Sequence, residues 1–343
     1  MKKYYLILVA LCFCNVSIVY SQQKVALHSN GSTTIFGGSD PFTAAYNASV
    51  SGDTLYLPGG TIPYPTTINK GLVIIGTGHY PDSTVATGKT VLTGNLSISE
   101  DADNLHLEGI ELTGGISFTH NHKVDSVVIK RCKFNNIYYN GTGATPCINN
   151  NIIENVIAGE AVFNNVTSSM LSNNIINGQI ANANNIGISN NILLFNSGCT
   201  GNPSCVTFNN VDNCYISNNI VFRNNASWVC SGCDLNTFAN NIFAVVPSTG
   251  TNTWINNYYS IVLTSVFVNQ TGNVFNYTHN YHLTNPTTYL GIDNTQVGIY
   301  GGLYPCKEGA VPQNPHIQII NNAATTDTNG NLQIQIQVEA QND

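Results

Sequence analysis

The sequence predicts an all-β solenoid, a stack of similar coils made of short strands, and two observations support this fold class. The segment 206–222, VTFNNVDNCYISNNIVF, nearly repeats 22 residues later as WVCSGCDLNTFANNIF in 228–243, and it resembles AVFNNVTSSMLSNNII in 161–176. Repeats of about this length are typical of solenoids. In addition, short apolar runs alternate with glycines from residue 72 and with asparagine pairs from residue 147. Both patterns indicate short strands joined by tight turns.

Residues 1–21 are predicted to be a signal peptide. Lysines at positions 2 and 3 precede an apolar stretch over 5–13, and Val19-Tyr20-Ser21 supplies a cleavage site. The apolar stretch is too short to cross a bilayer as a helix. We therefore expect cleavage before Gln22 and a secreted or cell-surface protein without a membrane span, the alternative being an uncleaved anchor.

The composition narrows the classes of partner. Charged residues make up 8% of the chain, the net charge is −7, and there is no basic patch. This argues against nucleic acid as a partner. The polar character comes from amides and hydroxyls, above all asparagine, which favours neither helices nor strand interiors. Turns are the expected structural cause of this bias.

Residues 22–66 are predicted to form an N-terminal cap. Asp40 can accept backbone N–H groups as an N-cap and Pro41 suits a first helical turn, so FTAAYNAS is expected to be a short helix. A strand over Thr54–Leu57 follows and ends at Pro-Gly-Gly. A solenoid needs such a cap because its first coil otherwise exposes apolar core and unpaired strand edges.

The coils are predicted over 67–300 and a closing segment over 301–343. In GNLQIQIQVEA, aliphatic residues at 332, 334, 336 and 338 alternate with amide or acidic residues at 333, 335, 337 and 339. Strict alternation predicts a half-buried strand. We expect this strand to pack against the side or end of the solenoid as a closing element.

The asparagine pairs set the register of the coils. The second asparagine of each pair precedes Ile, and Cys132 holds the same place in an earlier coil. Asparagine tolerates the left-handed backbone angles of a tight bend, and stacked coils place equivalent residues about 4.8 Å apart. We therefore predict a structural ladder of buried amides. Its expected members are Asn151, Asn174, Asn191, Asn219 and Asn241.

The IxNN, ISNN and FANN steps between Ile148 and Asn241 resemble those of the right-handed parallel β-helix, or pectin-lyase-like, family, and GDTLYLPGG resembles its first strand. The resemblance covers about residues 40–300 and implies a right-handed single-stranded parallel β-helix. It leaves the function open, because the family includes lyases, hydrolases, adhesins and inert stalks. Three-residue segments such as Asp53-Thr54-Leu55 resemble the O-glycosylation acceptor of exported Bacteroidetes proteins.

In the resembled enzymes the substrate lies outside the first strand of each coil. The expected outward residues here are Val162, Gln179, Thr207 and Val229, which are uncharged, and only Glu160 lies near that row. A lyase needs a base and a group that neutralises the substrate carboxylate, and an inverting hydrolase needs paired carboxylates. The catalytic candidates are therefore weak.

Asp212 and Asp234 occupy equivalent places in neighbouring coils, 22 residues apart. They are weak catalytic candidates together with Glu160. Two stacked carboxylates suit a Ca²⁺ ion, although the capping of backbone N–H groups is the favoured interpretation. No other cofactor is predicted.

The cysteines allow two local interpretations. Cys199 and Cys205 share the loop SGCTGNPSC, where a disulfide and two free thiols are equally compatible with the sequence. Cys230-Ser-Gly-Cys233 has a spacing typical of redox or zinc sites. The register instead places Cys230 inward, at the position of Phe208, and predicts buried thiols.

Aromatic residues in the predicted loops suggest a binding role. Such rings, beside amides and hydroxyls, suit flat sugar faces, but they can also simply cover the edge of a solenoid. The sequence therefore predicts a secreted or surface β-helix protein that is glycan-binding or structural, the alternative being a polysaccharide lyase or glycoside hydrolase that acts on an acidic glycan. The predicted binding residues are Tyr138, Tyr139, Trp254, Tyr258 and Tyr259.

Overall fold

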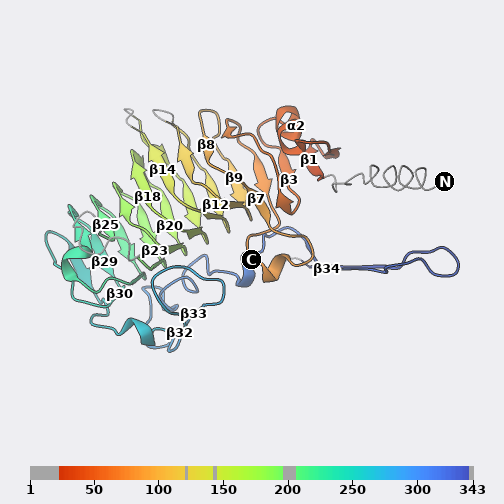
Figure 1. Ribbon diagram of the computed structural model, residues 1–343. Helices are drawn as coiled ribbons and strands as arrows, with labels where there is room; N and C mark the ends of the chain where they lie inside the picture. Colours follow the sequence, from red (N-terminus) through yellow and green to blue (C-terminus); the bar gives the residue numbers. More distant parts are fainter. Residues whose placement is uncertain (1–22, 120–122, 142–144, 196–205, 340–343) are drawn as a thin grey trace, which may run out of the picture.

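The computed structural model describes residues 23–119, 123–141, 145–195 and 206–339. The chain coils repeatedly through three long sheets that run the length of the body (Figure 1). Pairing between successive coils is parallel throughout these sheets, for example Ile129 with Ile152 and Ile152 with Leu171. The protein is therefore a parallel β-helix, as the sequence predicts.

Each coil passes through the three sheets in the same order. The first sheet contains β3 (Thr54–Tyr56), β6 (Val73–Ile75), β9 (His106–Glu108), β12 (Val128–Lys130), β16 (Asn151–Ile153), β20 (Met170–Ser172), β23 (Gly187–Ser189), β26 (Tyr215–Ser217), β29 (Thr237–Ala239) and β31 (Thr253–Ile255). The second contains β4 (Gly60–Thr61), β7 (Thr90–Leu92), β10 (Glu111–Leu112), β13 (Lys133–Phe134), β17 (Val156–Ile157), β21 (Ile175–Ile176), β24 (Ile192–Leu193), β27 (Ile220–Val221) and β30 (Ile242–Phe243). The third contains β5 (Thr67–Ile68), β8 (Leu96–Ile98), β11 (Ile116–Phe118), β14 (Ile137–Asn140), β18 (Ala161–Asn164), β22 (Ile180–Ala181), β25 (Phe208–Asn209) and β28 (Cys230–Ser231). In two successive coils a short extra strand lies between the third sheet and the first: β15 (Cys147–Ile148) pairs with β19 (Val166–Thr167).

The cap at the N-terminal end is an antiparallel hairpin and a helix. β1 (Val25–Ser29) pairs with both β2 (Ser32–Phe36) and β3 in antiparallel fashion, which covers the edge of the first coil. In α2 (Pro41–Ala48), the carboxylate of Asp40 accepts the N–H of Thr43 at 3.1 Å, which confirms the predicted N-cap. The hairpin has no counterpart in the prediction. The first coil already begins at β3, so the expected boundary at residue 66 falls inside it.

A ladder of asparagine amides forms the corner between the first and second sheets. Each side-chain Nδ2 donates to the Oδ1 of the asparagine in the next coil at 3.0 Å, and that Oδ1 also accepts a backbone N–H from the coil before at 2.9 Å. The ladder runs through Asn155, Asn174, Asn191, Asn219, Asn241 and Asn257. Cys132 precedes it, since its N–H donates to Asn155.

The structure corrects one predicted member of this ladder. Asn151 lies at the start of β16, on the outer face of the first sheet, where it pairs with Val128 and Met170. Asn155 takes the corner position in that coil. The pair Asn149-Asn150 forms the corner that leads into the first sheet, where Asn149 has a φ of 59°. The corner between the first and second sheets comes at Glu154-Asn155, where Glu154 adopts a φ of 56°.

The residue before each ladder asparagine, and likewise the residue before Cys132, has a left-handed backbone and points outward. These residues are Arg131, Glu154, Asn173, Asn190, Asn218, Asn240 and Asn256, with φ between 48° and 58°. Several hold the last part of the chain: Asn240 donates to Leu290 O, Asn190 to Gly298 O, and Asn173 to Ile299 O. The two asparagines of a pair therefore make different contacts. The first lies outside the coil and binds the last part of the chain, and the second lies inside the coil and forms the ladder.

The coil stack ends at β31, and the chain then folds back along the outer face of the second sheet. We call residues 259–313 the return segment; it contains η4 (Leu263–Ser265), β32 (Phe267–Asn269), β33 (Asn280–Leu283) and η5 (Glu308–Ala310). The N–H of Phe275 donates to Asn177 Oδ1 at 3.2 Å, although 98 residues separate them. The sequence predicts coils up to residue 300, and this is wrong for the return segment. Outward residues of the second sheet, such as Ile192 and Ile220, form one buried apolar cluster with Tyr281 and Val297 of the return segment.

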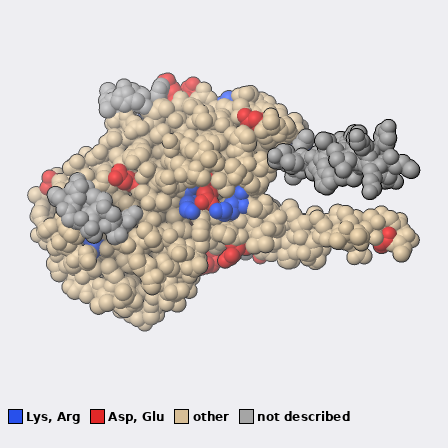
Figure 2. All heavy atoms as spheres, viewed as in Figure 1, with Lys and Arg blue, Asp and Glu red and all other residues tan. Residues whose placement is uncertain are grey.

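The C-terminal hairpin projects from the body instead of closing it (Figures 1 and 2). The predicted strand exists as β35 (Ile334–Glu339) and pairs with β34 (His316–Asn322). Its aliphatic side chains are exposed, with Ile336 at 55%. The expected packing against the side or end of the solenoid is therefore wrong. The alternating sequence shows that one face of this strand is apolar, but it does not show which part of the protein covers that face.

The ladder predicts that two asparagines with similar neighbours in the sequence, Asn219 and Asn151, differ greatly in how much stability is lost when each is replaced by alanine. Asn219→Ala removes an amide that donates to Ile188 O and Asn241 Oδ1 and accepts from Asn191, so buried groups in both neighbouring coils lose a partner. We expect a loss of about 3 kcal/mol in the free energy of unfolding. Guanidinium denaturation monitored by circular dichroism measures it.

Asn151→Ala serves as the matched control, since Asn151 lies on the outer face, and we expect a change within about 0.5 kcal/mol. Equal losses for the two variants would contradict the corner assignment.

Candidate functional site

The outer face of the third sheet is uncharged at Ser117, Tyr138 and Val162, but Val229, which the sequence predicts to face outward, is fully buried in the core. Tyr138 pairs with Ser117 on one side and Val162 on the other, and its ring is partly exposed. Partial burial raises the pKa of Tyr138, and the Glu160 carboxylate raises it further. Tyr138 lies on strand β14 and not in a loop as expected. This face offers one aromatic ring and one carboxylate.

The other predicted binding aromatics pack against the protein. Tyr139 is fully buried, stacked between Phe118 at 3.8 Å and Phe163 at 5.5 Å, so its predicted contact with a ligand is wrong. Trp254 stacks on Phe238 at 4.2 Å at the end of the interior column, and Tyr259 stacks on Phe243 at 5.9 Å. The hydroxyl of Tyr258 donates to Leu290 O and accepts from Leu290 N, both at 3.0 Å.

Of the two aspartates in equivalent places, Asp212 caps a backbone N–H and Asp234 binds a side-chain hydroxyl. Asp212 Oδ1 accepts the N–H of Asp234 at 2.8 Å, and Asp234 Oδ1 accepts from the Thr251 hydroxyl at 2.6 Å. In the described part of the chain, no group of three or more His, Cys, Asp and Glu side chains is placed to hold a metal ion. Nor does any described helix have the length and apolar character needed to cross a membrane.

Cys230 and Cys233 form a disulfide, with 5.9 Å between their Cα atoms. Cys230 pairs with Phe208, so the predicted register is right, but the expectation of two free thiols is wrong. Cys199, Cys205 and the predicted signal peptide lie outside the described residues.

Three adjoining hollows form a row that we call the seam. Two lie between the β-helix and the return segment, and the third lies where Asp82 and Ser83 meet the base of the C-terminal hairpin. The central cavity has a volume of about 220 Å³. A second hollow of about 260 Å³ shares Val156 and Tyr277 with it, and a third of about 330 Å³ shares Asp82, Ser83 and Glu308. The seam is therefore an elongated site and not a single pocket.

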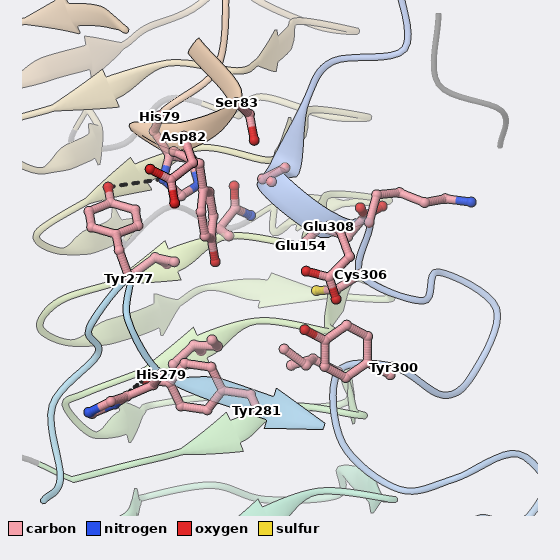
Figure 3. Close-up of a pocket in the computed structure, with 18 residues that line it drawn as sticks. His79, Asp82, Ser83, Glu154, Tyr277, His279, Tyr281, Tyr300, Cys306 and Glu308 are labelled. Carbon is pink, nitrogen blue, oxygen red and sulfur yellow. Dashed lines mark hydrogen bonds between the residues drawn. The ribbon is translucent and has the colours of Figure 1, made fainter. Parts of the chain in front are cut away.

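Tyrosine rings form much of the wall of the central cavity. Tyr80 comes from the loop before η1 (Asp82–Thr84), and it meets Tyr277 edge to face at 4.9 Å. The return segment supplies Tyr277, Tyr281 and Tyr300. Figure 3 shows Tyr277 and His79 on one side of the cavity and Tyr300, Cys306 and Glu308 on the other.

His79 is a buried, neutral histidine in this wall. Its Nδ1 lies 3.2 Å from the hydroxyl of Tyr277, and its Nε2 has no hydrogen-bond partner among the described residues. Complete burial lowers its pKa to about 3; Glu111 opposes this shift, while Lys133 and Lys89 add to it. The imidazole is therefore uncharged near neutral pH.

Carboxylates lie at the floor and rim of the cavity. Glu154 is buried, with Arg131 at 2.8 Å and Lys130 at 3.5 Å. Arg131 also reaches Glu108 at 3.3 Å and donates to Val311 O at 3.0 Å, which ties the return segment to the coils. At the rim, Glu308 lies 2.8 Å from His282, whose ring stacks on Tyr300 at 3.8 Å.

A compact charged group lies beyond Tyr277, where the return segment no longer covers the second sheet. Lys89 and Lys133 both bind Glu111, and the Lys133 ammonium lies 4.9 Å from the centre of the Tyr277 ring. Burial raises the pKa of Glu111, but its hydrogen bonds and charge interactions with the two lysines outweigh this and lower it overall. Figure 2 shows how few charged side chains lie on this face, with basic and acidic groups side by side near its middle.

The sequence contains a signal for the seam that the prediction overlooks. The second-sheet strands carry two consecutive apolar residues in later coils, as in Ile175–Ile176 and Ile220–Val221, which indicates burial on both faces. In earlier coils the outward residue becomes Glu111 or Lys133, so the cover ends there. His279 of the return segment also lines the central cavity.

Comparison with known proteins finds no matching family model, no matching curated protein and no matching solved structure. The functional assignment therefore depends on the residues of the site.

His79 predicts a pH dependence of stability. Its pKa is about 3 in the folded protein and near 6.5 when unfolded, so the unfolded chain takes up a proton first. The contribution of His79 to the free energy of unfolding is complete above pH 6.5. It declines as the pH falls toward 3, by about 3 kcal/mol between pH 7 and pH 4. The charged groups that act on it, Glu111, Lys89 and Lys133, are unchanged in the variant His79→Gln.

We expect His79→Gln to lose stability less steeply than the wild type over this range, measured by denaturation at several pH values. His28→Gln, at an exposed histidine of the N-terminal hairpin, is the control and should keep the wild-type slope. A wild-type slope in His79→Gln would contradict the neutral buried state.

Proposed function

We propose that this is a secreted or surface β-helix protein that binds a polysaccharide along the seam. The observation that carries this proposal is the row of three adjoining hollows whose walls combine tyrosine rings, asparagine amides and carboxylates. Sugars present flat apolar faces ringed by hydroxyls, and aromatic rings beside polar groups match that pattern. A row of hollows suits several units of a polymer better than one small molecule.

The frame of the seam favours binding without large rearrangement. One wall is the parallel second sheet, and the other is held to it by the outward corner residues, including Asn173, Asn190 and Arg131. A preformed site loses less conformational entropy when a ligand binds. The face of the third sheet, with Tyr138 and Glu160, is the alternative binding surface.

A glycoside hydrolase is the second candidate, because Asp82, Glu154 and Glu308 all line the central cavity. An inverting enzyme needs one protonated and one ionised carboxyl group on opposite sides of the sugar. Both oxygens of Glu154 already face cations, Lys130 and Arg131, and these contacts restrain the side chain. The pairing of Glu154 supports binding more strongly than catalysis.

Substitutions on the two faces locate the site. We expect Tyr300→Ala to weaken polysaccharide binding about three- to tenfold through loss of one stacking ring, and Tyr138→Ala to bind as the wild type does. Affinity electrophoresis and calorimetry on neutral, acidic and amino-sugar polysaccharides measure both, with thermal melting as the check on folding.

The opposite ranking of the two variants would move the site to the third sheet. New reducing or unsaturated ends that vanish in Glu308→Gln would show an enzyme. The absence of binding to every polysaccharide would favour a structural role.

A further inference from the structure

We propose that the central cavity of the seam binds a cationic nitrogen, the ammonium group of an unacetylated amino sugar or a quaternary ammonium group. This inference rests on the proposed polysaccharide function for its ligand in the first case. It depends on three features of the cavity: its aromatic wall, its charge and one unpartnered buried nitrogen.

The aromatic wall favours a cation. Tyr80, Tyr277, Tyr281 and Tyr300 all line a cavity of about 220 Å³. The face of an aromatic ring is negative, so several rings around one small space attract an ammonium group, most strongly when water is excluded. The cavity is smaller than the roughly 300–1,000 Å³ of sites for drug-sized ligands, and it suits one sugar unit or one ammonium group.

The carboxylates that line the cavity carry the charge that attracts a cation. Asp82, Glu154 and Glu308 face one cationic side chain, Lys307. Burial raises the pKa of the Cys306 thiol in this wall, Glu154 and Glu308 raise it further, and only Arg131 opposes them. The carboxylates therefore make the Cys306 side of the cavity negative, while on the His79 side Lys89 and Lys133 act against Glu111. Lys133 lines the neighbouring hollow beyond Tyr277, where it is paired with Glu111.

His79 supplies a polar contact that is otherwise unexplained. Its side chain is fully buried and lines the cavity, yet Nε2 meets no hydrogen-bond partner in the described ranges. When Nδ1 carries the proton and donates to the Tyr277 hydroxyl, Nε2 presents a lone pair that accepts an N–H of an amino-sugar ammonium group. A quaternary ammonium group has no N–H, so it uses only the rings and the carboxylates. Because the imidazole is neutral, it does not repel a cation.

The test compares charged and neutral ligands of similar size on the whole mature chain. Calorimetry at pH 6 uses glucosamine and choline, with glucose and N-acetylglucosamine as neutral counterparts. We expect at least one cationic ligand to bind at least tenfold more tightly than the neutral sugars. Binding of glucosamine alone identifies the amino sugar as the source of the cation, and binding of choline alone identifies a quaternary ammonium group.

Two pairs of variants separate the cavity from the general effect of charge. Glu308→Gln removes a carboxylate that is 75% exposed, so the fold should be kept, and cation binding should fall at least fivefold. Glu160→Gln, on the third sheet, should change nothing. Tyr300→Phe keeps the ring face and should bind, whereas Tyr300→Leu should not.

Equal affinity for glucosamine and glucose, unchanged in Glu308→Gln, would overturn the inference while leaving polysaccharide binding intact. Cation binding without any polysaccharide binding would support the inference and remove the proposed function. Failure to bind either cationic ligand would overturn the inference whatever the polysaccharides show.

Discussion

The bend between the first and second sheets is the constraint on which the rest of the molecule depends. At this corner one residue must adopt a left-handed backbone, and the next must place a polar side chain inside an apolar column. A single buried amide would be costly there, but a continuous ladder supplies each amide with partners above and below. The buried amides at the corner therefore hydrogen-bond from coil to coil, and these bonds fix the register of successive coils.

The same corner also organises the outside of the molecule. A left-handed residue directs its side chain away from the column, and the return segment binds along that line of side chains. Toward the N-terminal end the asparagines give way to Arg131 and Glu154, which form buried ion pairs instead of amide contacts. Removing one partner of such a network leaves an uncompensated buried charge, so these contacts hold the wall of the seam tightly in place.

The sequence predicts the parallel β-helix because the repeated Asn-Asn-Ile steps report a local backbone requirement. It predicts the return segment poorly, because contacts such as Asn177 with Phe275 join residues far apart in the chain and leave no periodic pattern. The site was misplaced for a related reason. Tyr138 and Tyr139 look equivalent in the sequence, but adjacent residues of a strand face opposite sides, so one is exposed and the other is in the core. The cavity tyrosines come from two separate segments that only the fold brings together.

The pairing of corner residues with the return segment limits how this chain can change its length. Open solenoids grow or shrink by duplication or loss of whole repeats, because each repeat contacts only its neighbours. Here Asn240 is matched to Leu290 and Arg131 to Val311, so residues 290–311 pass the coils in the reverse of their sequence order. An extra coil would displace one set of contacts by about 4.8 Å relative to the other. Gain or loss of a coil in evolution therefore requires a compensating insertion or deletion in residues 259–313, and the two changes are expected to occur together in any lineage that alters the number of coils.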